Sequence, residues 1–289
     1  MRGMDRNLLG AIALAAVLCT ALPGARAFDE MKYPDWKGQW TRVPSLARVS
    51  PNPSFDPDKP DGLAQEAPLT PEYRAILEAS LADLAAGGGG DDRNYLCFSN
   101  GMPRMMTVYS TMEILIMPET TYMLMGTFRD IRRIFTDGRD WSEPIEPSAT
   151  GYSIGNWIDD KRDGHYSVLE VETHGFNGPR ALDNTGLPLH RDNQTVVKER
   201  IFSDKADRNI LHDEITLIDH AFTRPWTVTK NYRRSPQSRP VWRADACVEG
   251  NQHLRIGKDS YMLSADGHLM PGKKEQAPPD LRYFEKPRR

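Results

Sequence analysis

Hydrophobic and polar residues alternate in short runs along most of the chain, and the clearest case lies between residues 151 and 176. Two apolar runs there flank a polar turn, Ile158–Gly164, which is rich in Asp and Gly. A turn of this composition between two apolar runs is typical of a β-hairpin. The small residues Gly151, Ser153 and Gly155 leave room on its first strand for a neighbouring backbone or a bound molecule. We expect this hairpin to lie at the centre of an all-β domain.

Similar short runs, separated by close turns, precede and follow the hairpin. They predict further strands at residues 107–111, 112–118, 121–127, 130–136, 195–202, 209–219, 226–233 and 245–248. A helix is expected before them, because Thr70 is a suitable N-cap, Pro71 suits the first helical position and Gly87–Gly90 ends the pattern. The predicted fold class is all-β and mainly antiparallel: a lipocalin-like barrel or a bent sandwich, with one N-terminal helix packed outside.

The first strand contains the step Gly38, Gln39, Trp40. Lipocalin-like barrels begin with a Gly-x-Trp step, in which the Trp plugs the closed end and an Arg stacks over it. An ordinary buried Trp on a first strand is the alternative.

The N-terminal residues predict a secretory signal peptide. Arg2 and Arg6 give a positive start, residues 8–22 form an apolar core, and Pro23–Ala27 ends in an Ala-x-Ala cleavage site. The apolar core is short for a spanning helix, and no later stretch is long and apolar enough to span a bilayer. We expect residues 1–27 to be removed and the mature chain to be periplasmic or secreted.

The mature chain is expected to have three parts. Residues 28–68 hold the first strand and an extended Pro-rich segment. Residues 69–270 form a single β-rich domain with its leading helix, and residues 271–289 form an irregular tail.

The charge and the cysteines narrow the class of protein. The 289 residues carry a formal net charge of −3, whereas a nucleic-acid binder normally presents a basic face, so no nucleic-acid partner is expected. Cys97 and Cys247 are the cysteines left after the signal peptide, and an oxidising compartment favours a disulfide between them. Two buried free thiols are the alternative.

Candidate catalytic residues occur around a long polar loop at residues 175–192. His174 and His190 bracket this loop, and Asp183 and Asp192 are its carboxylates. Long loops on a rigid barrel often carry binding groups, and a His beside a carboxylate can act as a general acid or base near neutral pH. In the alternative, these residues cap turns or face water.

Neighbouring residues on a strand point to opposite faces, which bears on several charged positions. Of Arg132 and Arg133, one should point into the barrel, and we favour Arg132; a buried charge there needs a partner or a function. Within the pairs His212–Asp213 and Asp219–His220, the two side chains should not line the same site.

The candidate ligand-binding residues are aromatic side chains on or beside the strands, together with one cation. They are Tyr152, Trp157, Phe176, Trp226 and Arg139. The methionines between residues 102 and 125 suit either a core or the lining of a ligand pocket.

A metal site is a further possibility, because several residues could supply ligands: His174, His190, Asp192, His212 and His220. No two of them have the spacing of a known metal motif, so neither a metal nor a cofactor is assigned. The chain also lacks a Gly-x-Ser-x-Gly elbow, a Walker loop and a dinucleotide fingerprint after a strand.

Several segments together resemble a family of exported, largely uncharacterised bacterial proteins. The matching segments are LTPEY at 69–73, CFSNGMPR at 97–104, RRIFTDGR at 132–139, GYSIGNW at 151–157, LEVETHGF at 169–176, Glu199-Arg200 and TRPWTVT at 223–229. The similarity covers most of the chain from Trp36 to Glu249. This chain departs from it in the longer turn at 159–165, and Leu189 and Arg191 replace a Pro and a Ser around the retained His190. The resemblance implies export and a β-rich fold, and it implies no agreed activity.

Two functional hypotheses follow. The first is an exported β-barrel that binds a small, partly apolar molecule, aromatic or terpenoid, in its interior. The alternative is a cofactor-independent lyase, isomerase, hydratase or hydrolase, with a His/Asp acid–base pair in the barrel mouth and Arg132 or Arg139 holding an anionic group. A structural envelope protein without a pocket is a third possibility, and the oligomeric state is not indicated.

Overall fold

The computed structural model describes residues 28–43, 67–92, 98–242 and 253–278, except for 109, 129, 142–143, 179–180, 258 and 265. Contacts divide the chain at Met31, and the elements discussed below belong to the second unit, Lys32–Arg289. The predicted signal peptide, most of the Pro-rich segment, the strand expected at 245–248 and both cysteines of the predicted disulfide lie outside the described residues. No described helix is long and apolar enough to cross a membrane.

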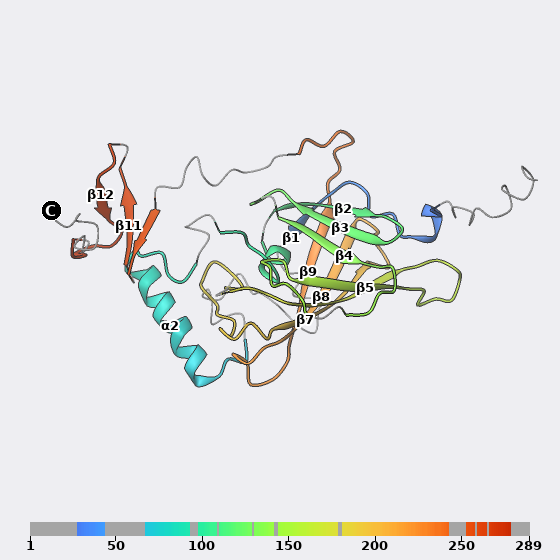
Figure 1. Cartoon of the computed structure of the whole chain (residues 1–289). Helices are drawn as coiled ribbons and strands as arrows, with labels where there is room; N and C mark the ends of the chain where they lie inside the picture. The colour runs from blue at the N-terminus through green and yellow to red at the C-terminus, as the bar shows by residue number, and fades with distance from the viewer. Residues whose placement is uncertain are drawn as a thin grey trace, which may run out of the picture. The chain divides into compact units, whose positions relative to one another are not determined.

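Nine strands form a closed barrel in which every strand pairs with its neighbours in sequence, and the first pairs with the last (Figure 1). The strands are β1 (Gln39–Val43), β2 (Thr111–Ile116), β3 (Thr120–Met125), β4 (Ile131–Phe135), β5 (Tyr152–Ile158), β6 (Val168–His174), β7 (Val196–Ser203), β8 (Ile210–Ile218) and β9 (Trp226–Arg234). The all-β, mainly antiparallel fold is confirmed, and of the two predicted architectures the barrel is the one observed.

A closed ring of nine strands cannot be antiparallel at every seam, because strand direction must return to itself after one circuit. The ring has one parallel pair, β4 with β5, and the other eight seams are antiparallel. The parallel pairing is short and joins Ile134 to Ser153 and Phe135 to Ile154. The connection at residues 136–151 therefore carries the chain back along the barrel before β5 begins.

The interior follows from the alternation of side chains along each strand. On β8, the inward residues Leu211, Asp213, Ile215 and Leu217 are almost fully buried, whereas the residues between them are partly exposed. Most inward positions on the other strands are apolar, and they belong to one continuous core. The exceptions include the neutral Thr121, Ser153 and Thr173 and several charged residues, which are described with the candidate site.

The end of the barrel where β1 begins has the arrangement expected of a lipocalin-like opening. Trp40 is fully buried, its indole N–H donates to the carbonyl of Trp36 at 2.9 Å, and the Arg234 guanidinium lies 4.6 Å from the centre of its ring. The stacking cation comes from β9, which is the strand that closes the barrel onto β1.

Helix α2 (Pro71–Ala85) lies outside the barrel, as predicted (Figure 1), and its buried side chains join the core cluster. Its N-cap is Thr70, whose hydroxyl accepts from the Tyr73 N–H at 3.4 Å. Tyr73 and Leu77 are buried against the core, and the Ser80 hydroxyl donates to the carbonyl of Thr185 at 2.8 Å. These contacts fix the helix against the loops that connect the strands at that end of the barrel.

Three short strands near the C-terminus were not predicted: β10 (His253–Ile256), β11 (Asp259–Leu263) and β12 (Leu269–Pro271). They form an antiparallel sheet of their own. Among the side chains described in these strands, only Tyr261 is buried. The strands therefore lack a regular alternation of buried apolar and exposed polar residues. Such short strands with little buried surface offer little of the alternation on which a sequence-based assignment depends.

Candidate functional site

Five charged side chains from five different strands are buried in or at the wall of the barrel. They are Arg42 of β1, Arg132 of β4, Glu199 of β7, Asp213 of β8 and Lys230 of β9. Charges in an apolar core are costly unless they are paired, so the partner of each one matters. Four of them form a satisfied pair and an unsatisfied pair, and the fifth, Arg42, donates to the carbonyl of Thr107.

Arg132 and Glu199 form the satisfied pair. Two nitrogens of the guanidinium contact the two carboxylate oxygens, one of them at 2.8 Å. Arg132 also donates to Ser153 at 3.2 Å and to Thr173 at 2.8 Å. The expected inward orientation of Arg132 is found, and Arg133 is exposed. Since Glu199 already neutralises Arg132, this arginine is a cross-link inside the barrel rather than a free anion-binding group.

Asp213 and Lys230 form the unsatisfied pair, and they lie opposite each other on β8 and β9. Asp213 is fully buried, and neither of its carboxylate oxygens has a hydrogen-bond partner among the described residues. Lys230 is 5% exposed, and no hydrogen bond or ion pair links it to another described side chain. Among the described residues, they are the two charged side chains of the interior whose bonding capacity remains available.

The buried environment shifts both groups toward their neutral forms. Burial raises the pKa of Asp213 well above its usual range, and the nearby charge of Glu199 adds to the rise. Burial also lowers the pKa of Lys230 to about 7, helped by the charge of Arg42 and opposed by Asp183 and Asp213. A carboxylic acid and an amine that both titrate away from their ordinary ranges are typical of functional sites.

The walls around these groups are apolar and rich in methionine. Met112, Met123 and Met125 point inward and are essentially fully buried, and all three belong to the continuous core. Polar contacts tie a segment before β2 to the interior: the Tyr232 hydroxyl donates to the carbonyl of Met106, and Arg42 donates to the carbonyl of Thr107. Of the two roles considered for the methionines, a place in the core is the one observed for these three.

The predicted polar loop after β6 packs its leucines into the core, where Leu182, Leu187 and Leu189 are buried. The Asp183 carboxylate accepts from the backbone N–H groups of Thr185 at 3.0 Å and Leu187 at 3.4 Å, which stabilises a turn. Asp183 was predicted to orient a histidine; the hydrogen-bond partners described here lie in this turn instead, and its charge acts on Lys230.

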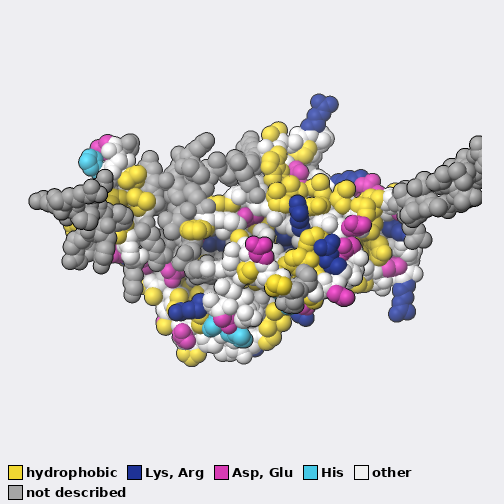
Figure 2. Space-filling view, in the orientation of Figure 1, with side chains coloured by type: hydrophobic (Ala, Val, Ile, Leu, Met, Phe, Trp, Pro, Cys, Tyr) yellow, Lys and Arg dark blue, Asp and Glu magenta, His cyan; other side chains and the backbone are white. Residues whose placement is uncertain are grey.

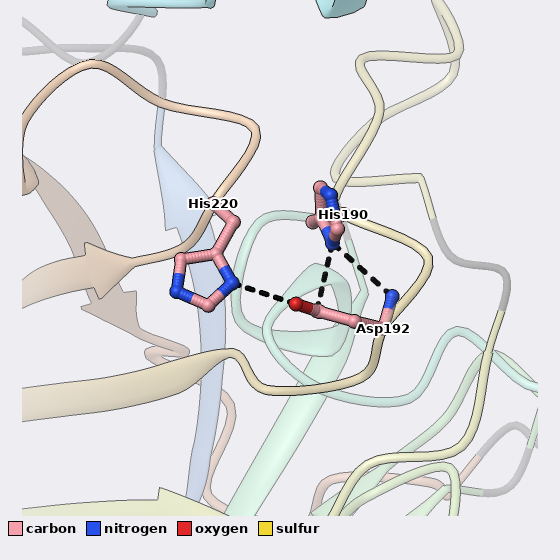
Figure 3. Close-up of side chains that lie close together, drawn as sticks. All are labelled: His190, Asp192 and His220. Carbon is pink, nitrogen blue, oxygen red and sulfur yellow. Dashed lines mark hydrogen bonds and ion pairs between the residues drawn. The ribbon is translucent and has the colours of Figure 1, made fainter.

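A second polar cluster lies at the surface, on two loops. Asp192 is held between two imidazoles: its Oδ1 lies 2.8 Å from His190 Nδ1, and its Oδ2 lies 2.6 Å from His220 Nδ1 (Figure 3). The side chains of the three residues are 28%, 31% and 69% exposed for His190, Asp192 and His220. On the face of the molecule drawn in Figure 2, histidine side chains lie beside acidic ones at the surface.

Within this surface cluster, the carboxylate and the imidazoles each stabilise the charged form of the other. Partial burial acts to raise the pKa of Asp192, but the hydrogen bonds from His220, Gln194 and His190 outweigh it and lower the pKa below the usual range. The hydrogen bond to Asp192 correspondingly raises the pKa of His220. The sequence analysis placed His190 and Asp192 on one loop and named His220 with them among five possible metal ligands. No spacing in the sequence indicated that these three would meet, because the two loops are far apart along the chain.

His174 does not join either cluster. It is the last residue of β6, and because Thr173 points inward, His174 points outward. Its Nε2 lies 2.7 Å from Glu172 on the same outer face, and its ring packs against Trp141 with centroids 4.3 Å apart. The structure therefore separates His174 from His190 and from the barrel interior.

Tyr152 and Arg139, two of the candidate ligand-binding residues, also lie on the outer face. Tyr152 precedes the inward Ser153, and its hydroxyl accepts from Arg139 at 3.3 Å. Arg139 is bound to Asp137 and stacks over Phe135, 3.8 Å from the ring centre. These contacts account for both side chains without a ligand.

Of the other three aromatic candidates, Phe176 and Trp226 are buried in the core, and Trp157 is partly buried and packs against it. Phe176 is 1% exposed, and Trp226 is 5% exposed and packs edge-on against Phe222. Trp157 packs against Trp36 with centroids 5.1 Å apart, and its indole N–H has no partner among the described residues.

Sequence analysis missed Asp213 and Lys230 as site residues, although the signal was available. Asp213 alternates with three buried apolar residues on β8, and Lys230 lies between the inward Val228 and Tyr232 on β9. A charged residue at an inward position of an alternating strand is the expected mark of a functional site in a barrel. The expectation that His212 and Asp213 face opposite sides is confirmed, since His212 bonds Asp204 and Asn231 outside the interior.

Comparison with protein-family models and with curated proteins gave no match to this chain. The resemblance to exported bacterial proteins therefore stays a prediction, and function is argued from the geometry.

Proposed function

We propose that the chain is a β-barrel that binds a small, partly apolar molecule in its interior, with Asp213 and Lys230 as the polar contacts. The observation that carries this proposal is that Asp213 is fully buried while neither of its oxygens accepts or donates a hydrogen bond among the described residues. A buried polar group left without a partner costs about 1–3 kcal/mol. A bound molecule that supplies the partner would recover that cost.

The chemistry of the two groups narrows the ligand. Asp213 in its protonated form can donate one hydrogen bond, and the amine of Lys230 can donate or, when neutral, accept. A carbonyl or hydroxyl oxygen between them would satisfy both. The inward methionines suit an apolar body of variable shape, such as an aromatic or terpenoid skeleton.

The test is a binding screen of the purified protein against aromatic and terpenoid carbonyl compounds and alcohols, by thermal shift and by quenching of tryptophan fluorescence. A ligand at 100 times its Kd stabilises the folded state by about 2.7 kcal/mol, which gives a measurable shift. Asp213→Asn and Lys230→Met should weaken binding of any hit. Lys198→Met is the matched control, because Lys198 lies on the outer face, 2.9 Å from Glu172. Equal affinities in all four proteins would place the ligand elsewhere.

A second candidate function is cofactor-independent proton transfer, as in a lyase, isomerase or hydratase. It is favoured by the pKa of Lys230 at about 7, which makes the amine a usable base at neutral pH, with the protonated Asp213 as the acid. In this version of the enzyme hypothesis, the acid–base pair is Asp213 and Lys230 inside the barrel, and it replaces the His/Asp pair that was expected in the barrel mouth. If the chain is an enzyme, the unmodified protein should convert its substrate, and the Asp213→Asn variant should bind the substrate without converting it. If the chain is a binding protein, neither the unmodified protein nor the variant should convert the ligand.

Export is a separate part of the proposal and has its own test. Residues 1–27 have the three regions of a signal peptide. Expression of the full chain in a bacterium, followed by fractionation and N-terminal sequencing, should give a mature protein that starts near Phe28 outside the cytoplasm. An intact N-terminus in the cytoplasmic fraction would contradict it.

A further inference from the structure

We propose that His190, Asp192 and His220 bind one divalent transition-metal ion of the Zn²⁺ class at the surface of the barrel. The site is separate from the interior pair, and the inference does not depend on the proposed ligand-binding function. One ligand atom from each residue lies within 4.8 Å of the others. The three side chains come from two loops, before β7 and between β8 and β9 (Figure 3).

The donor set selects the class of metal. Two imidazole nitrogens and one carboxylate oxygen suit Zn²⁺ and its neighbours among the first-row metals, whereas Ca²⁺ and Mg²⁺ prefer sites made of oxygen. The charge of Asp219, next to His220 in the chain, adds to the negative potential at the cluster. Three protein ligands leave at least one coordination position for water.

The geometry is close to what coordination requires. In a tetrahedral site with bonds of about 2.0–2.1 Å, neighbouring ligand atoms lie about 3.3 Å apart. Here the Asp192 oxygens lie 2.8 Å from His190 Nδ1 and 2.6 Å from His220 Nδ1. These two contacts use different oxygens of Asp192, and one ligand atom from each residue lies within 4.8 Å of the others. Rotation of the side chains would have to bring the three atoms to the spacing of a single metal centre.

The His190 imidazole already faces the Asp192 carboxylate, whose Oδ1 lies 2.8 Å from Nδ1. A metal ion bound here would take the place of the proton shared by these two atoms, because an imidazole nitrogen must be deprotonated to coordinate a metal. Binding should therefore release a proton.

The backbone holds both loops in place before any ion binds. Asp219 is buried, and its Oδ1 accepts from the N–H of His190 at 2.9 Å and from the N–H of Ala221 at 2.8 Å. Tyr73 of α2 packs against the His190 ring at 5.1 Å between centroids, and its hydroxyl accepts from the N–H of Arg191. Because these bonds fix the loops that carry all three ligands, little order must be created on binding.

The test is metal titration of the purified protein, prepared without a polyhistidine tag and stripped with a chelator. Zn²⁺ is followed by calorimetry and Co²⁺ by its visible absorption, with thermal shift as the second readout. We expect one ion per chain. His220→Ala and Asp192→Asn should each weaken binding at least about tenfold, because even the loss of an outer partner of a metal ligand costs 10- to 100-fold. His220→Ala removes an exposed side chain, so it should leave the fold intact.

His268→Ala is the control, since His268 is an exposed histidine beside Asp266, 3.6 Å away, in a different part of the chain. Its metal affinity should equal that of the unmodified protein. The proposal is overturned if neither Zn²⁺ nor Co²⁺ binds, or if all three variants bind equally well. A Co²⁺ spectrum with thiolate charge-transfer bands would also overturn it, because it would place the ion on the cysteines.

Discussion

Arg132 and Glu199 illustrate how a buried charge depends on its partner. Both side chains are almost completely inaccessible, and each would be an isolated charge in the core without the other. We predict that Glu199→Ala lowers the free energy of unfolding by about 3–5 kcal/mol, measured by urea denaturation. The double variant Arg132→Met, Glu199→Leu should recover much of this loss, since it leaves no unpaired charge. Additive losses in the double variant would show that the packing of these residues, and not their charge, is what matters.

Lys230 gives a prediction about pH. An unfolded chain holds its lysine protons up to a pKa of about 10.4, whereas in the barrel the pKa of Lys230 is about 7. Between these values the unfolded state binds more protons, so the free energy of unfolding should rise as the pH rises from about 7 to about 10. Below about pH 7 the amine is charged in both states, and the cost of burying it is fully present.

Asp213 acts in the opposite sense, because its raised pKa makes stability fall as the pH rises above about 4. The measurement therefore uses the Asp213→Asn background. The unfolding free energy of this variant should climb between pH 7 and pH 10, and the climb should be lost on adding Lys230→Met. Identical pH profiles for the two would mean that Lys230 is not shifted.

At the scale of elements, the connections around α2 depend on one acidic side chain. Asp219 accepts hydrogen bonds from the backbone of two different loops, and its other oxygen accepts from the Thr195 hydroxyl at 2.5 Å. Asp219→Ala leaves two N–H groups unsatisfied, so we expect a loss of about 1–3 kcal/mol in urea denaturation. Thr223→Ala, in the same turn but with an exposed hydroxyl that donates to the carbonyl of Pro68 at 3.0 Å, serves as the comparison and should cost less.

The elements themselves were largely predictable because their signals are local. The alternation in residues 151–176 and the capping pattern at Thr70 each lie within one element, and both gave the right type of structure. The space left by Gly155 illustrates the limit. A Cβ there would meet Ile134 at 2.6 Å, so the room is filled by a neighbouring strand and not by a ligand. Which strand is the neighbour depends on barrel closure, which no local pattern contains.

The candidate sites were less predictable, because each brings together residues that are far apart along the chain. The meeting of Asp192 with His220 depends on how two loops fold over one end of the barrel. Asp213 and Lys230 face each other only because β8 and β9 pair in one register, and a shift by one residue would turn one of them outward. Sequence alternation could mark each residue as inward, but it could not place the two together.

For the whole molecule, the parallel seam between β4 and β5 should be the weakest part of the barrel wall. It is paired over two residues on each strand, whereas β8 and β9 pair along almost their whole length. We expect backbone amides of β4 to exchange with deuterium faster than those of β8 under native conditions, measured by mass spectrometry. Uniform protection around the ring would show that the barrel opens only as a unit.

The same seam constrains how such a barrel can change in the course of evolution. Adding or deleting a single strand reverses the direction of every strand that follows it in the barrel. A viable change must therefore also add or remove a long connection such as the one at residues 136–151, which makes β4 and β5 parallel. A relative with eight strands could alternate throughout and would need no such return. Strand number and crossover should therefore be inherited together, as a single unit of insertion or loss.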